Sequence, residues 1–211
     1  MQIFGLLIGA SLLLVTAPTV LTANQRDWDD CKANDPERSI AGCTRILERK
    51  DESTHNLSVA YNDRGLAFRR RGDPDRSIAD FGEAMRLGPK DATHFYNRGL
   101  AYGDKRELDR AIADHTEAIR LGPDRNAIDA RSGATLSDDR AYADYFYGRG
   151  VAYQGKGDLD RAIADFTAAI RLQPRYAIAY ASRGSAYEAK GECDRAAADY
   201  SEAIRLGTKD D

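Results

Sequence analysis

The chain has 211 residues, and its 31 Lys and Arg side chains nearly balance its 34 Asp and Glu side chains, leaving a formal net charge of -3. The two signs are spread evenly along the sequence, so no basic stripe is available to bind the phosphates of a nucleic acid. The sequence also lacks a glycine-rich phosphate loop, a serine or cysteine nucleophile motif and a cluster of metal ligands. It therefore predicts a protein that is not an enzyme, with no catalytic residue, metal or cofactor.

Residues 1–23 contain no charged side chain and include an apolar run that ends before Pro18. This composition is typical of an export signal, and the small residues Thr22 and Ala23 permit cleavage before Asn24. The alternative is an uncleaved anchor in the inner membrane, because the apolar run is about 20 residues long, near the length that spans a bilayer. The sequence thus predicts an exported protein, located in the periplasm of a bacterial-type envelope, that touches a membrane only if residues 1–23 are retained.

Residues 24–57 echo the sequence that follows them. PERSIAGCTRIL, which begins at Pro36, is similar to PDRSIADFGEAM, which begins at Pro74. The match predicts two short antiparallel helices on either side of Asp35 and Pro36, in a degenerate half-repeat that serves as an N-terminal cap.

Four segments of 34 residues repeat one another from residue 58 onward. Each contains a phrase such as YNDRGLAF, beginning at Tyr61, and a second such as DRSIADFGEAMRLGP, beginning at Asp75. Key residues recur three and four apart within both phrases, which predicts two amphipathic helices per segment, with Asp73 and Pro74 starting the second helix. The units are residues 58–91, 92–125, 143–176 and 177–210.

This pattern of aromatic, glycine and small residues resembles the tetratricopeptide repeat. The resemblance implies an all-α fold, a right-handed α-solenoid of helix-turn-helix units, in which the small residues let helices approach and the aromatic residues fill the space between them. It implies no chemistry for the matching residues. In the first unit these are Tyr61, Gly65, Phe68, Ser77, Phe81, Ala84 and Pro89.

The three cysteines can be interpreted once the cap is compared with a repeat. Its two antiparallel helices would bring Cys31 and Cys43 close enough for a disulfide, which an exported protein can keep. The alternatives are two buried free thiols or, with His55 nearby, a zinc site. Cys193 is left over as an odd thiol, either free or paired between chains.

Each unit has an arginine where the family usually has a leucine before the glycine, and an aspartate sixteen residues later. Antiparallel helices would bring these residues together, so we expect a ladder of structural ion pairs. The alternative is an arginine ladder that binds anionic ligands. The pairs are Arg64 with Asp80, Arg98 with Asp114, Arg149 with Asp165, and Arg183 with Asp199.

Two segments depart from the regular repeat. Residues 126–142 are an insert that is expected either to form a loop near the binding surface or to reflect neutral drift, and its residues 137–139 resemble an N-cap that lengthens the next helix backward. In the last unit, Ala197 stands where earlier units have isoleucine, which predicts a built-in C-terminal cap. Self-association through that end is the alternative.

The resemblance also implies a concave groove, lined by the first helix of each unit, that takes an extended peptide or a partner helix. Tyr96 and Tyr147 are the best candidate anchors, and the alternative is that they pack against the next repeat. No lysine accompanies the asparagines of this groove, which disfavours capture of a terminal carboxylate. The expected groove residues are Asn62, Leu66, Arg69, Tyr96, Asn97, Leu100, Gly103, Tyr147, Val151, Gln154, Ala181, Ser185 and Glu188.

The sequence therefore predicts a non-catalytic adaptor that binds a protein or peptide partner, and no nucleic acid, in the cell envelope. The first alternative is a structural envelope protein that self-assembles into a homo-oligomer. The second is an accessory subunit that regulates an envelope enzyme. Repeat folds host many functions, so the partner's identity does not follow from the sequence.

Overall fold

A computed structural model describes residues 23–122 and 138–207, and within those ranges the chain forms ten helices and no strand. The all-α solenoid predicted from the sequence is confirmed. Residues 1–22 and most of the 126–142 insert lie outside the described residues. The helices are α1 Ala23–Cys31, α2 Pro36–Leu47, α3 Thr54–Arg70, α4 Pro74–Leu87, α5 Ala92–Asp104, α6 Leu108–Leu121, α7 Asp138–Gly155, α8 Leu159–Leu172, α9 Ala177–Ala189 and α10 Cys193–Gly207.

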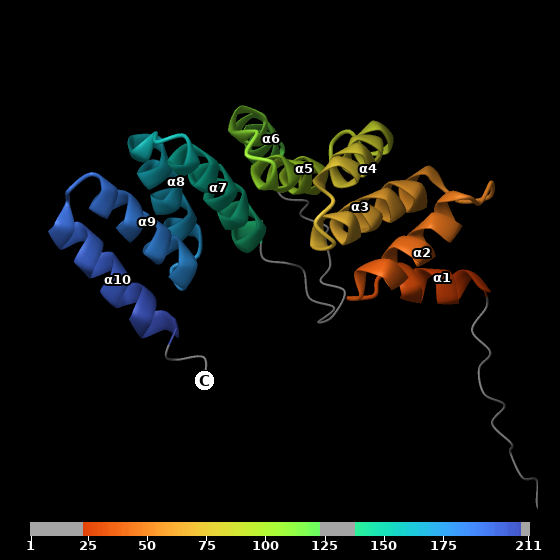
Figure 1. Ribbon diagram of the computed structural model, residues 1–211, viewed down its shortest axis with the longest axis horizontal. Coiled ribbons are helices and arrows are strands. Elements are labelled where there is room, and N and C mark those ends of the chain that lie inside the picture. The colour runs from red at the N-terminus through yellow and green to blue at the C-terminus, as the bar shows by residue number, and fades with distance from the viewer. Residues whose placement is uncertain (1–22, 123–137, 208–211) are drawn as a thin grey trace, which may run out of the picture.

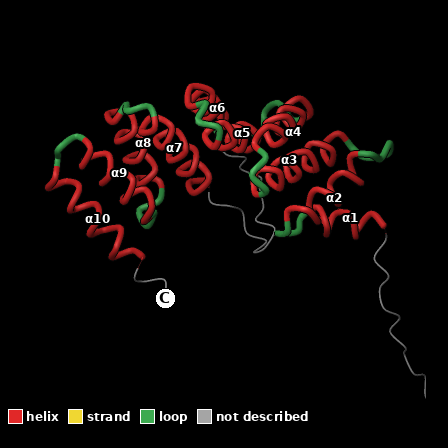
Figure 2. Tube along the Cα trace, viewed as in Figure 1, coloured by secondary structure: helices red, strands yellow, loops and turns green. Residues whose placement is uncertain are grey.

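The helices follow one another around an arch, with α1 at one end and α10 at the other (Figure 1). Each helix packs against the next in the chain, and the first helices α3, α5, α7 and α9 also contact one another in sequence. Short loops join the two helices of each pair (Figure 2). The chain thus forms a solenoid whose first helices are neighbours in space.

The turn inside each unit follows from its local sequence. Asp73 accepts a hydrogen bond from the backbone N–H of Arg76 at 3.2 Å, and Pro74 occupies the first position of α4, where a missing N–H costs nothing. Gly72 lies just past the end of α3 with φ of 80°, a left-handed conformation that glycine adopts without strain. These residues end one helix and begin the next within a few positions.

Close helix approach inside a unit depends on a glycine beneath an aromatic ring. A Cβ atom placed on Gly150 of α7 would lie 2.8 Å from the ring of Phe166 on α8, closer than carbon atoms pack. Phe166 is fully buried. The glycine of the repeat pattern therefore sets the distance between the first and second helices.

The two ends of the solenoid differ. The N-terminal segment forms a complete but short helix pair, α1 and α2, and α3 begins at Thr54, before the unit boundary at residue 58. At the other end, Ala197 reduces the apolar surface as expected, but Ile204 remains 67% exposed. The expectation of a built-in C-terminal cap is therefore only partly met.

Candidate functional site

The face made by α3, α5, α7 and α9, here called the first-helix face, carries the residues that the sequence assigns to a groove. The four helices contact one another in order, so equivalent positions of the four units follow one another across this face. The assigned residues differ widely in exposure and in their contacts.

Tyr96 and Tyr147 are both engaged in packing against other aromatic rings. The ring centroid of Tyr96 lies 5.5 Å from that of His115 and 5.1 Å from that of Tyr145 in the next unit. Tyr147 lies 5.7 Å from Phe166 and 5.3 Å from Tyr176. Burial raises the pKa of Tyr96 well above its ordinary value. Tyr96 thus packs against the next repeat, as the alternative for it holds, whereas the rings beside Tyr147 belong to its own unit and its hydroxyl reaches the next one, at Ser182.

The half of the face formed by α3 and α5 is polar and internally bonded. Asn97 is only 5% exposed and donates a 2.9 Å hydrogen bond to Asn62, which corrects its assignment as a residue open to a partner. Arg69 pairs with Asp104 at 2.6 Å across the two helices. The expected apolar residues of this half, Leu66 and Leu100, are only partly exposed.

The half formed by α7 and α9 offers the accessible apolar side chains. Val151 is 44% exposed, as its assigned position predicts, and Ile178 is 54% exposed. Gln154 donates to Ser185 at 3.2 Å, and the Tyr147 hydroxyl lies 3.3 Å from that of Ser182. Sequence reasoning missed Ile178, although the repeat alignment places it at the register of Val59 in the first unit, at the start of a first helix.

Carboxylates add negative charge to the same face. Burial raises the pKa of Asp63, which also accepts a hydrogen bond from Asn62. Asp144 accepts a hydrogen bond from the Tyr176 hydroxyl. Neither aspartate was predicted for this face from the sequence.

The four arginines of the ladder each form two parallel hydrogen bonds with the expected aspartate. In the third unit, Arg149 bonds to Asp165 through two contacts of 2.8 Å, and the guanidinium lies 5.7 Å from the Phe146 ring and 5.9 Å from the Tyr153 ring. The four aspartates are 5–6% exposed. Because each guanidinium is bound to a carboxylate, the ladder does not present free arginines to an anion. The pairs are Arg64–Asp80, Arg98–Asp114, Arg149–Asp165 and Arg183–Asp199.

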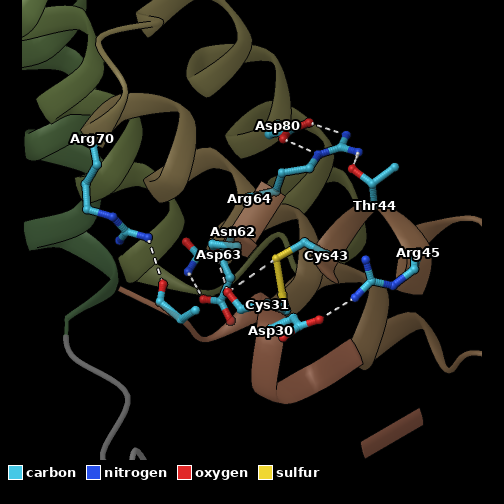
Figure 3. The surroundings of a disulfide bond; sticks show 12 residues. Asp30, Cys31, Cys43, Thr44, Arg45, Asn62, Asp63, Arg64, Arg70 and Asp80 are labelled. Carbon is cyan, nitrogen blue, oxygen red and sulfur yellow. Dashed lines mark hydrogen bonds and ion pairs between the residues drawn. A yellow bond between two sulfur atoms is a disulfide. The ribbon is translucent and has the colours of Figure 1, made fainter. Parts of the chain in front are cut away.

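The N-terminal cap carries the disulfide. Cys31 at the end of α1 and Cys43 in α2 are bonded with Cα atoms 4.5 Å apart, and both are buried. Figure 3 shows this bond beside the first rung of the arginine ladder, where Arg64 bonds to Asp80 and reaches Thr44 of the cap. Cys193 is an exposed free thiol.

One group of side chains has the composition of a hydrolase triad without its geometry. The Ser58 hydroxyl donates to the Ala84 carbonyl at 3.0 Å, so it accepts a hydrogen bond from the Nε2–H group of His94 at 2.9 Å. The Asp91 carboxylate lies 3.6 Å from the same Nε2 atom. A triad needs the serine and the aspartate on opposite ring nitrogens. This cluster therefore ties α3 to α5 and does not activate Ser58.

Residues 23–122 and 138–207 contain no group of three or more His, Cys, Asp or Glu side chains placed to hold a metal ion. In those ranges no helix combines the length and the apolar character needed to cross a lipid bilayer.

Paired antiparallel helices, stacked so that the first helices share one face, define a helical repeat scaffold. The sequence matches the tetratricopeptide repeat family over residues 62–126 and 147–211. The chain therefore belongs to this family, as the residue pattern predicts. No match was found among curated protein sequences.

Several solved structures share the fold. A crystal structure of MamA is 23% identical, with a TM-score of 0.69 over 90% of this chain and 97% of that one. MamA 41-end from Desulfovibrio magneticus RS-1 is 17% identical, with a TM-score of 0.69 over 88% and 93%. The second tetratricopeptide domain of human RPAP3, solved in complex with the HSP70 peptide SGPTIEEVD, is 24% identical, with a TM-score of 0.53 over 64% and 98%. At these identities the likeness establishes the fold.

Proposed function

We propose that the protein is a non-catalytic adaptor that binds a peptide or a helix of another protein on its first-helix face. The exposure of Val151 and Ile178 on α7 and α9 carries this proposal. A contiguous exposed apolar surface rimmed by polar residues is typical of an interaction site. Burying them against a partner would contribute roughly 25 cal/mol for each Å² of apolar surface removed from water.

The polar groups around these two residues indicate what the partner offers. Gln154 and Ser185 are bonded to each other, which holds a pair of hydrogen-bonding groups in place beside an apolar surface. An amphipathic helix or an extended apolar peptide supplies matching apolar anchors along one side and polar groups along the other. The RPAP3 domain was solved with a bound peptide, the same class of occupant.

A terminal carboxylate is a poor candidate for the bound group. The helices α3, α5, α7 and α9 contain no lysine. Arg69 is already paired with Asp104, and Asp144 adds negative charge. A carboxylate placed beside Asp144 would meet like charge, and Arg69 is already engaged with a carboxylate of its own.

We also propose that the protein works in an oxidising compartment outside the cytoplasm, such as the periplasm. The uncharged residues 1–23 support export, and the disulfide between Cys31 and Cys43 supports an environment in which it persists. Retention of residues 1–23 as an inner-membrane anchor is the alternative. Mass spectrometry of the mature chain distinguishes the two, because cleavage removes those residues.

Photo-crosslinking in the native cell tests the adaptor function. A photoreactive amino acid replaces Val151, which is more exposed than the packed Tyr147, and a matched control probe replaces the exposed Ala113 on second helix α6. We expect one heterologous protein to be attached at position 151, not at position 113, and to be lost in the Ile178→Asp variant. Attachment of another copy of this chain alone, or of the same proteins at both positions, would contradict the proposal.

A further inference from the structure

The outer face of α10, formed by Asp194, Ala197, Ser201 and Ile204, occupies the place where a preceding unit receives the next one. Ile204 is 67% exposed, whereas its counterpart in the third unit, Ile170, is 9% exposed. Ile170 belongs to a buried cluster with Ala179 of the following helix α9. Ile204 therefore stands at a position that is covered in the third unit.

The same face repeats a second feature of the junctions between units. At three junctions an arginine of the following first helix donates from Nη1 to a threonine on the preceding second helix; for example, Arg183 bonds to Thr167 at 3.0 Å. In α10 this register is held by Ser201, an exposed residue whose hydroxyl donates to the Ala197 carbonyl at 2.8 Å. A hydroxyl that donates one bond still accepts others, so Ser201 retains the capacity to accept from an arginine. The other two pairs are Arg64–Thr44 and Arg149–Thr116.

A third feature is a cation that crosses every junction to a carboxylate in the first turn of the preceding second helix. Lys190 reaches Asp160 at 2.5 Å, and equivalent residues do the same along the whole stack. In α10 the equivalent carboxylate is Asp194, which is exposed. The other pairs are Arg71–Glu37, Lys105–Asp75 and Lys156–Asp109.

These three features specify the helix that complements the face. The first helix that packs against each preceding unit carries three residues at fixed spacing. These are an arginine, an alanine three residues later and a lysine or arginine four residues after the alanine, as in Arg183, Ala186 and Lys190. The alanine is fully buried in α9, where it lies against Ala162 and Phe166 of α8. A partner helix needs the same spacing to satisfy Ser201, the apolar surface and Asp194 together.

The N-terminal end of a second copy does not have this pattern. Matching Pro36 of the cap to Pro74 of the first unit places Arg26 at the arginine register, but Asp29 at the alanine register and Ala33 at the last cation register. Asp29 is exposed, and its carboxylate accepts a hydrogen bond from Gln25. Head-to-tail stacking would press this carboxylate against the apolar surface of α10, which disfavours a copy of the chain as the occupant.

We propose that the outer face of α10 docks a helix of another protein that carries an arginine, an alanine three residues later and a lysine or arginine four residues after that. The docked helix continues the solenoid across two chains. This site is separate from the first-helix face and does not depend on the function proposed for it.

A stapled fluorescent peptide with the sequence of residues 177–191 tests the proposal, since α9 already satisfies the same kind of face. Anisotropy is followed as the full chain is added. We expect saturable binding that weakens about tenfold or more in Ile204→Asp, as truncated interface anchors show, and that weakens in Asp194→Lys. A Lys190→Glu version of the peptide should recover binding to Asp194→Lys. Ala113→Asp, at an exposed position on α6, serves as the control and should leave binding unchanged.

Three outcomes would overturn the assignment. The first is no saturable binding of the peptide to the unaltered chain. The second is binding that Ile204→Asp does not change. The third is an apparent molecular mass in solution that rises with protein concentration for the unaltered chain but not for Ile204→Asp. That result would identify a second copy of the chain as the occupant of this face. Because residues 194 and 204 are exposed, circular dichroism is expected to show unchanged helical content in both variants.

Discussion

Arg149 on α7 and Asp165 on α8 are joined by two parallel hydrogen bonds of 2.8 Å between guanidinium and carboxylate. Asp165 is 5% exposed, so its charge has little access to water. Arg149→Leu leaves this carboxylate buried without its partner, and we expect the free energy of unfolding to fall by about 3 kcal/mol. Urea denaturation monitored by circular dichroism measures the change.

Two variants make this test specific. Replacing both residues, as Arg149→Leu with Asp165→Leu, should recover much of the lost stability, because no charge then stays buried. Arg120, whose side chain is 66% exposed in its pair with Glu117, is the control, and Arg120→Leu should change stability by less than about 1 kcal/mol. An unchanged urea midpoint for Arg149→Leu would show that the ladder is dispensable.

The disulfide between Cys31 and Cys43 closes a short loop, with a sequence separation of 12. Such a crosslink restricts the unfolded chain, and its loss is expected to lower stability by about 3 kcal/mol. We expect reduction to lower the thermal midpoint of the chain and Cys193→Ser, on an exposed residue, to leave it unchanged. Thiol titration of the denatured chain should detect Cys193 before reduction and all three cysteines after it. Three reactive thiols before reduction would contradict an oxidised cap.

The fold was predictable because its determinants lie within single units. Arg149 and Asp165 are sixteen residues apart and lie on the two antiparallel helices of one unit. The turn between these helices brings the two positions together. The turn residues Asp73 and Pro74 act within a few positions of each other. Such local relationships recur in every unit, so each unit supports the interpretation of the others.

The candidate site was less predictable because exposure depends on neighbouring units. Repeat register puts Tyr96 on the first-helix face, but its burial comes from His115 and Tyr145, and Tyr145 belongs to the next unit. Asn97 is buried in the same way, by contacts that its own unit does not contain. Ile178 was in the alignment, yet its accessibility follows only from the packing of α9 on α8.

His115 of α6 occupies the position that Phe166 holds in α8, and burial lowers the pKa of its imidazole to about 3. The unfolded chain, with a histidine pKa of about 6.5, therefore binds a proton that the folded chain excludes. The contribution of neutral His115 to the free energy of unfolding is therefore fully present above the unfolded-state pKa and is lost as the pH falls below it. The expected loss is about 1.4 kcal/mol between about pH 7.5 and about pH 5.5. Burial also lowers the pKa of His94, which adds to the same trend.

His115→Phe should remove the His115 contribution to this pH dependence and raise stability at neutral pH. Nδ1 of His115 is buried without a hydrogen-bond partner, a cost of about 1–3 kcal/mol that phenylalanine avoids. Urea midpoints measured across the pH range give the slope for each variant. His55→Gln changes an exposed side chain and should keep the wild-type slope. An equal slope in His115→Phe would mean that the buried ring does not exclude the proton.

Arg106 lies two residues past the end of the first helix of the second unit, and its φ of 59° lies in the left-handed region. The other three units have glycine there, at Gly72, Gly157 and Gly191, with φ between 78° and 80°. A side chain with a Cβ is strained in this conformation by about 1–2 kcal/mol, so Arg106→Gly should raise the free energy of unfolding by about 1 kcal/mol after the added freedom of the unfolded chain is counted. Arg106→Ala is the control, because it removes the guanidinium and keeps the strain. Equal urea midpoints for the alanine and glycine variants would show that charge, not backbone conformation, limits stability at this turn.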